Sequence, residues 1–262
     1  MKMPELVKIL QVIAYIVAPV WNILYSSNAY TSYAEEIKTI CILPAPYAFS
    51  VWGPIYIGMF AYTVYDAWKQ APQTYERKVV TILLIVTAIA DFGFAFAAKA
   101  QNYLWATLLI IMHLVPLAFV NKLIRERIVK EGVETPLWVY PPVSMFFAWV
   151  SVATVASASQ LLYEWGVRPS QVWSQIIAIV LITVLTLIAG IQAWLRDYAY
   201  TLVVVWAFTA IAVGQWSVLA VGISASLACV GLTLYITYLY GVQKRSPYWV
   251  KQESWTKEAD FN

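Results

Sequence analysis

The chain has 262 residues, of which 61% are hydrophobic and 12% are charged, whereas soluble domains average about 45–50% and about 25%. Its 17 basic and 14 acidic residues give a net charge of +3 and gather in short stretches between long apolar runs. This composition excludes a soluble enzyme domain, a disordered chain and a nucleic-acid-binding protein, and it predicts an all-α, polytopic integral membrane protein.

Eight apolar runs predict the membrane-spanning helices, because a bilayer core of about 30 Å requires about 20 apolar residues in a helix. In chain order the runs are residues 6–25, 46–68, 79–98, 103–120, 138–163, 174–195, 198–215 and 218–240. We expect Pro54 and Pro116 to interrupt the second and fourth helices. Because the fourth and seventh runs are short, a seven-helix count that merges or drops one of the last three runs is the main alternative.

The first run is flanked by lysines, as in a signal peptide, but it is too long and no clean cleavage site follows it. We therefore expect a helix that is retained.

The placement of the basic residues favours eight helices. If Met1 lies inside, 14 of the 17 Lys and Arg residues fall on the inner side, and only Lys38, Lys99 and Arg168 fall outside. Inner loops of membrane proteins carry such an excess of basic residues, and this pattern requires an even number of spans. We expect both termini in the cytoplasm and the protein in the cell membrane.

Two ionisable residues lie deep in the apolar runs. Asp91 is the only carboxylate well inside a predicted helix, and His113, the only histidine, lies near the middle of the next one. A charged Asp at the bilayer centre costs about 2.5–3.5 kcal/mol, so we expect Asp91 to be protonated, paired or in a wet cavity. Two interpretations stay open: a functional pair, or a hydrogen bond that only holds the third and fourth helices together.

Aromatic and polar residues from five predicted helices fall at a similar depth when residues are counted from the helix ends. They are Trp21, Asn22, Trp52, Tyr56, Asp91, His113 and Trp149. Trp52, Trp149 and Trp206 lie deeper than the interfacial belts to which most Trp and Tyr belong. A buried indole offers a flat wall and an N–H that needs a partner. The pattern predicts a pocket in the outer half of the membrane that accepts a flat ligand.

Two motifs resemble the TspO/MBR family, the tryptophan-rich sensory proteins. Residues 44–56 read PAPYAFSVWGPIY, similar to the family's Pro-rich loop followed by a Trp and, four residues later, a Tyr. Residues 148–154 read AWVSVAT, similar to the family's last helix. The third helix departs from the family pattern, because Asp91 stands where the family has Asn. The residues beyond Tyr163 have no counterpart in the short, five-helix members.

The resemblance implies a five-helix bundle over residues 1–165, to which residues 166–243 add about three helices and residues 244–262 a cytoplasmic tail. It also implies a cavity for a flat apolar ligand of the porphyrin or haem type, or for a lipid or sterol, with a sensory, regulatory or transport role. The expected ligand-binding residues are Trp21, Asn22, Tyr47, Phe49, Trp52, Tyr56, Asp91, His113 and Trp149.

The alternative function is a proton-coupled small-molecule transporter that uses Asp91 and His113. An enzyme is not expected, since one His, one buried Asp and no metal cluster give little from which to build a hydrolytic or redox site, and only the resemblance suggests porphyrin breakdown. We expect no required cofactor and no nucleic acid; the expected partners are the lipid bilayer and a tetrapyrrole or other apolar small molecule. Small residues at four-residue steps favour internal helix packing and leave a homodimer open.

Overall fold

The computed structural model describes residues 5–26, 41–68, 75–131 and 140–250. Within these ranges the protein contains eight α-helices and no strand. They are α1 (Glu5–Ser26), α3 (Trp52–Trp68), α4 (Tyr75–Lys99), α5 (Tyr103–Glu131), α6 (Pro141–Glu164), α7 (Val172–Trp194), α8 (Tyr198–Gly214) and α9 (Leu219–Thr237). A short 3-10 helix, η1 (Pro46–Val51), precedes α3, and a π-helical turn, η2 (Tyr238–Val242), follows α9.

The predicted all-α membrane fold is confirmed. Among the described residues, five helices are long and apolar enough to cross a membrane: α4, α5, α6, α7 and the continuous helix formed by α9 and η2. The helices α1, α3 and α8 overlap the predicted runs 6–25, 46–68 and 198–215, but the run 46–68 begins with η1 and becomes α-helical only at Trp52. Among the described residues, the apolar segment of α1 is Val7–Val17 and that of α8 is Tyr198–Gly214. Eight crossings, with both termini in the cytoplasm, therefore stay a prediction.

Two helices differ from their predicted form for physical reasons. The fourth run was expected to end at residue 120, but α5 continues to Glu131 because Ile124 and Ile128, one turn apart, stay buried against the core. Pro54 does not interrupt a helix, because it is the third residue of α3. In the first turn of a helix the N–H that proline lacks has no intrahelical partner. Pro116 does lie inside α5.

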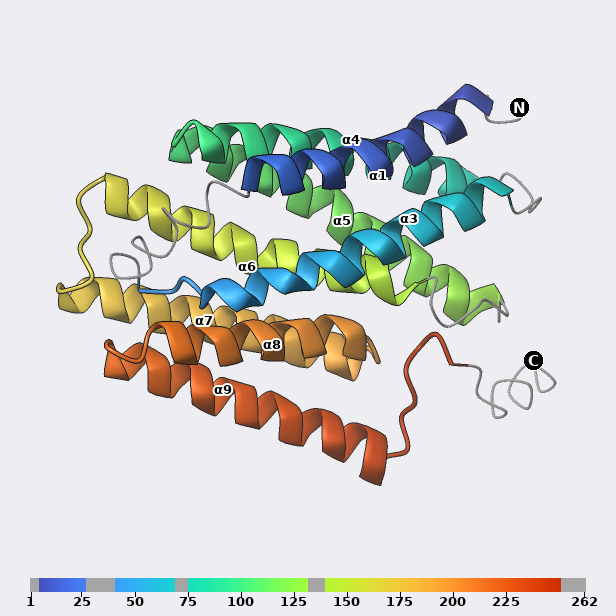
Figure 1. Ribbon diagram of the computed structural model, residues 1–262. Coiled ribbons are helices and arrows are strands. Elements are labelled where there is room, and N and C mark those ends of the chain that lie inside the picture. Colours follow the sequence, from blue (N-terminus) through green and yellow to red (C-terminus); the bar gives the residue numbers. More distant parts are fainter. Residues whose placement is uncertain (1–4, 27–40, 69–74, 132–139, 251–262) are drawn as a thin grey trace.

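The helices α1, α3, α4, α5 and α6 pack into a bundle, and α7, α8 and α9 pack against this bundle mainly through α8 (Figure 1). The contact between α6 and α8 is aromatic and close, since the rings of Phe147 and Tyr200 lie 4.9 Å apart. Buried side chains from both groups of helices form one continuous hydrophobic core. Residues 172–237 are therefore an integral layer of the fold.

The described cations concentrate at one end of the bundle, which we call the basic end. There α1 and α4 begin and α3, α5, α7 and η2 end (Figure 1). The opposite end holds η1 and the turns between α4 and α5 and between α8 and α9. The opposite end has only Lys99 and Arg168 among the described basic residues, as the charge count predicts.

A buried hydrogen-bond network closes the basic end. Asp197 is fully buried and caps α8, accepting from the N–H of Tyr200 (3.2 Å) and from Nδ2 of Asn121 on α5 (3.0 Å). Nδ2 of Asn121 also donates to Oγ of Ser144 on α6 (2.9 Å), which lies 3.1 Å from the hydroxyl of Tyr248. Burial raises the pKa of Asp197 above its usual range, although the hydrogen bonds from Asn121 and Ser144 oppose this rise.

Gly58 permits the close contact between α3 and α6. A Cβ at this position would lie 2.6 Å from Cβ of Pro142, which is nearer than real Cβ atoms approach. We expect Gly58→Ala to destabilise the protein by about 1–3 kcal/mol, the usual cost of overpacking, and to lower its thermal unfolding temperature in detergent.

Gly231→Ala on α9 is the matched control, because no neighbouring atom lies within 4 Å of its new Cβ. Equal unfolding temperatures for the two variants would contradict the proposed close contact.

Candidate functional site

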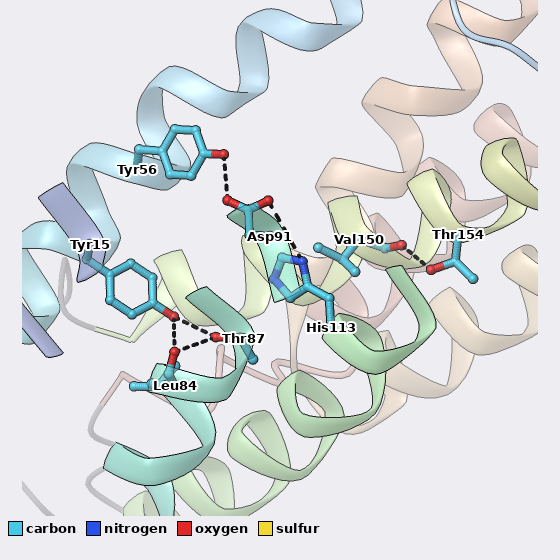
Figure 2. A network of polar contacts seen from close by, with 8 residues as sticks. All are labelled: Tyr15, Tyr56, Leu84, Thr87, Asp91, His113, Val150 and Thr154. Carbon is cyan, nitrogen blue, oxygen red and sulfur yellow. Dashed lines mark hydrogen bonds and ion pairs between the residues drawn. The ribbon is translucent and has the colours of Figure 1, made fainter. Parts of the chain in front are cut away.

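Asp91 lies where α3, α4 and α5 meet, and its side chain is almost completely buried. The hydroxyl of Tyr56 on α3 donates to Oδ2 of Asp91 at 3.1 Å. Nδ1 of His113 on α5 lies 3.9 Å from Oδ1, as Figure 2 shows, within reach of an ion pair but too far for a hydrogen bond. The structure therefore brings together the two deep ionisable residues of the predicted site.

Five rings form an aromatic cluster beside this pair. The cluster comprises Phe49, Trp52, Tyr56, Phe146 and Trp149. The ring of Trp52 stacks on Tyr56 with centroids 4.8 Å apart and meets Trp149 edge to face at 6.2 Å. Phe146 joins the cluster to the polar pair, because its ring meets the imidazole of His113 at 4.8 Å. The two indoles contact each other, so a ligand that lies between them has to separate them.

Two buried residues of the site carry polar atoms without a hydrogen-bond partner among the described residues. They are Nε1 of Trp149 and both ring nitrogens of His113. Trp149 is 1% exposed and His113 is fully buried, so water does not solvate these atoms from the surface. An unsatisfied buried donor or acceptor costs about 1–3 kcal/mol. These atoms are thus available to a bound molecule.

Helix α8 holds the segment that leads into the aromatic cluster. The N–H of Ala45 donates to the carbonyl of Ala210 at 2.9 Å, and Nε1 of Trp206 donates to the carbonyl of Ala48 at 3.0 Å. The ring of Trp206 also meets Tyr47 edge to face at 5.4 Å. Tyr47, at 43% exposed, therefore lies against α8 and outside the aromatic cluster.

The remaining predicted site residues and the missed ones lie on α1, α4 and α6. Trp21 and Asn22 belong to the last turns of α1, and their side chains lie outside the described part of the structure. Phe146 was not among the predicted site residues, although it precedes Trp149 by three residues and so shares its helix face. Sequence analysis also missed a hydrogen bond of 2.8 Å between Tyr15 on α1 and Thr87 on α4, one turn from Asp91 (Figure 2).

Two pockets lie away from the aromatic cluster. One, at the basic end, is lined by Tyr62, Tyr65, Asp66, Glu76, Arg77, Val80, Leu123, Ile124, Arg127 and Tyr140. The other, at the opposite end, is lined mainly by the segment after residue 40 and by α6 and α7, and it includes Cys41 and Ser174. Burial raises the pKa of the Cys41 thiol, whose Sγ lies 2.9 Å from Oγ of Ser174. Within the described residues, no group of three or more His, Cys, Asp or Glu side chains could hold a metal ion.

Comparison with known proteins gives one match. A sequence model of the family described as TSPO-like protein matches residues 8–238. This match continues through α7 and α8 to the end of α9, beyond the part of the chain in which the motifs were found. No curated protein and no solved structure matches the chain.

The hydroxyl of Tyr56 is expected to link α3 to α4. Tyr56→Phe keeps the ring on Trp52 but removes the hydroxyl that donates to Asp91. Hydrogen bonds between membrane helices contribute about 0.6 kcal/mol on average and at most about 1.7 kcal/mol. We expect a loss of stability in this range, measured by thermal unfolding in detergent.

Tyr75→Phe is the control, because Tyr75 is 79% exposed at the start of α4. A Tyr56→Phe protein as stable as this control would show that the hydrogen bond does not stabilise the helix contact.

Proposed function

The chain belongs to the TSPO-like protein family, and on that premise we propose that it binds a flat, largely apolar small molecule in the aromatic cluster beside Asp91 and His113. A tetrapyrrole of the porphyrin or haem type is the first ligand to test, and a lipid or sterol is the second. Binding would serve a sensory, regulatory or transport role. No cofactor is needed for this function.

The observation that carries the proposal is the set of buried polar atoms that lack hydrogen-bond partners. Nε1 of Trp149 and the ring nitrogens of His113 have no partner among the described residues, and the rings of Phe49 and Phe146 contact these two side chains. In lipid no water can replace that partner. A flat ligand with polar groups at its edge would supply hydrogen bonds to these atoms while its faces stack on the rings.

The difference in burial between Trp149 and Trp52 supports a proposal for how the aromatic cluster opens to admit a ligand. Trp149 lies on α6 and is only 1% exposed. Trp52 lies in the first turn of α3 and is half-buried. Trp52 is therefore the ring that moves more easily. Its movement would open the cluster toward the edge of the bundle while Trp149 stays in place.

Trp149→Phe tests the proposed hydrogen bond, because it keeps an aromatic ring and removes the indole N–H. Titration of the purified protein with protoporphyrin, followed by porphyrin absorbance, should give a Kd about tenfold higher, since a hydrogen bond of about 1.4 kcal/mol corresponds to a factor of ten. Trp216→Phe should leave the Kd unchanged, because Trp216 is 65% exposed in the turn between α8 and α9.

A protein in which both Trp52 and Trp149 are replaced by Ala should lose saturable binding. Saturable binding with the wild-type Kd in this double variant would place the ligand elsewhere.

Proton-coupled transport is the second candidate function. The observation that favours it is the close approach of two buried ionisable side chains, Asp91 and His113, from different helices. Ionisable residues within membrane helices commonly mark proton relays and substrate paths. A change of protonation in this pair would alter its charge and the packing of Phe146 against His113.

Flux of a porphyrin across proteoliposomes should then depend on pH, and Asp91→Asn should abolish this dependence because the amide does not titrate. Glu126→Gln is the control, since the Glu126 side chain is 43% exposed at the basic end and pairs with Lys122. A flux with the same pH dependence in Asp91→Asn would contradict proton coupling through Asp91, and the binding proposal would stand.

A further inference from the structure

Buried polar side chains continue from Asp91 toward the basic end along one face of α4. Arg77, Thr81, Thr87 and Asp91 are all buried, at most 3% exposed. Together with the carbonyl of Leu84 they follow steps of three or four residues, so they lie on one side of the helix. From Arg77 to Asp91 the helix rises by about 21 Å, at about 1.5 Å per residue.

The part of this face nearest the basic end lines a pocket. Nε of Arg77 donates to Oδ1 of Asp66 at 2.8 Å, and both side chains line the pocket at the basic end. This pocket has a volume of about 30 Å³, which is room for at least one water molecule. One turn further along α4, the hydroxyl of Thr81 bonds to the carbonyl of Arg77 at 3.1 Å.

Helix α1 contributes a hydroxyl group to the middle of this polar face of α4. The hydroxyl of Tyr15 lies 2.8 Å from Oγ1 of Thr87 and 3.2 Å from the carbonyl of Leu84, as Figure 2 shows. Thr87 in turn precedes Asp91 by one helical turn. The Tyr15–Thr87 pair is therefore the last polar contact before the carboxylate.

The gap between Thr81 and Tyr15 contains a further buried polar group. Helices α1 and α4 run in the same direction (Figure 1), so Gln11, one turn before Tyr15, lies level with the residues between Thr81 and Thr87. Gln11 is 1% exposed, and its Nε2 has no hydrogen-bond partner among the described residues. A water molecule at this point would satisfy the amide and join the neighbouring hydroxyls.

We propose that these residues form a proton path from the basic end to the Asp91–His113 pair. We call the path the polar seam; it consists of Asp66, Arg77, Thr81, Gln11, Tyr15 and Thr87. The proposal rests on the Asp91–His113 site of the proposed function. A proton from water at the basic end reaches the carboxylate of Asp91, while each hydroxyl or water on the way accepts one proton and passes one on. No group between the two ends changes its charge.

The groups around both ends fit this role. At the Asp91 end the other titratable side chains are His113 from α5, Tyr56 from α3 and Tyr15 from α1. At the basic end Asp66 and Arg77 compensate each other's charge. The further titratable side chains that line the pocket there are Tyr62, Tyr65, Glu76, Arg127 and Tyr140. Between these ends the seam has only neutral groups, so it can conduct a proton without burying another charge.

Threonines whose hydroxyl bonds to a backbone carbonyl of the preceding helical turn are common in membrane helices. Such threonines do not by themselves form a proton path. The unpartnered amide of Gln11 and the ion pair beside a water-sized pocket distinguish this face from the other helices. Thr186 on α7 illustrates the difference, because its Oγ1 bonds to the carbonyl of Ile182, and no hydrogen bond joins it to another helix within the described residues.

The test measures how fast Asp91 takes up a proton in the full-length protein. A pH step is applied to protein in lipid nanodiscs, and the carboxylic acid band that is absent in Asp91→Asn is followed by time-resolved infrared spectroscopy. Gln11→Leu and Thr81→Val should each slow this uptake at least tenfold while the midpoint pH of the band stays the same. A purely structural role would change stability or the midpoint and leave the rate unaltered.

Thr81→Ser restores a hydroxyl and should restore the wild-type rate, and Thr186→Val should keep it. Wild-type rates in both Gln11→Leu and Thr81→Val, an equal slowing in Thr186→Val, or no titrating band of Asp91 would each overturn the proton path. Protoporphyrin binding measured on the same variants separates this outcome from failure of the proposed function. If ligand binding is lost only in the Trp52 and Trp149 variants, the ligand site stands whatever the proton uptake shows.

Discussion

A polar side chain inside a membrane has to find its partner within the protein, because the lipid core offers neither donors nor acceptors. In this protein the requirement falls mainly on one face of α4. Arg77 meets Asp66, Thr87 meets Tyr15, and Asp91 accepts from Tyr56. The partners come from α1 and α3, so these polar contacts tie both helices to α4. The aromatic cluster then occupies the space next to the last of these polar contacts.

Sequence patterns predicted the helices and the approach of Asp91 to His113 because both follow from local or regular features. A run of about 20 apolar residues predicts a membrane-spanning helix whatever its neighbours are. Two ionisable groups deep in consecutive helices have few possible partners other than each other. The proximity of Trp52 and Trp149 was expected from their similar depth and from the family resemblance, and the two rings are in contact. The ligand, the cavity and the orientation of the ends stay predictions.

The rest of the site depends on contacts that no local pattern encodes. Gln11 and Tyr15 lie on a helix whose sequence gives no sign of which neighbour it will meet, and only the parallel packing of α1 on α4 aligns them with Thr87. The bond from Trp206 to the carbonyl of Ala48 likewise joins residues 158 positions apart. The extension of α5 past residue 120 arose from packing by Ile124 and Ile128, which charge counting could not reveal.

The network at the basic end also sets an order of events during synthesis. Ser144 on α6 and its partner Tyr248 after η2 are 104 positions apart in the sequence. Asn121 on α5 and its partner Asp197 are 76 positions apart. Chains emerge from the N-terminus onward, so α5 and α6 reach the membrane when Asn121 and Ser144 can bond only to each other and not yet to Asp197 and Tyr248. The partners arrive only when α7, α8 and the segment beyond α9 have been made. The network that joins α5 to α6 is therefore completed by residues that are made after both helices.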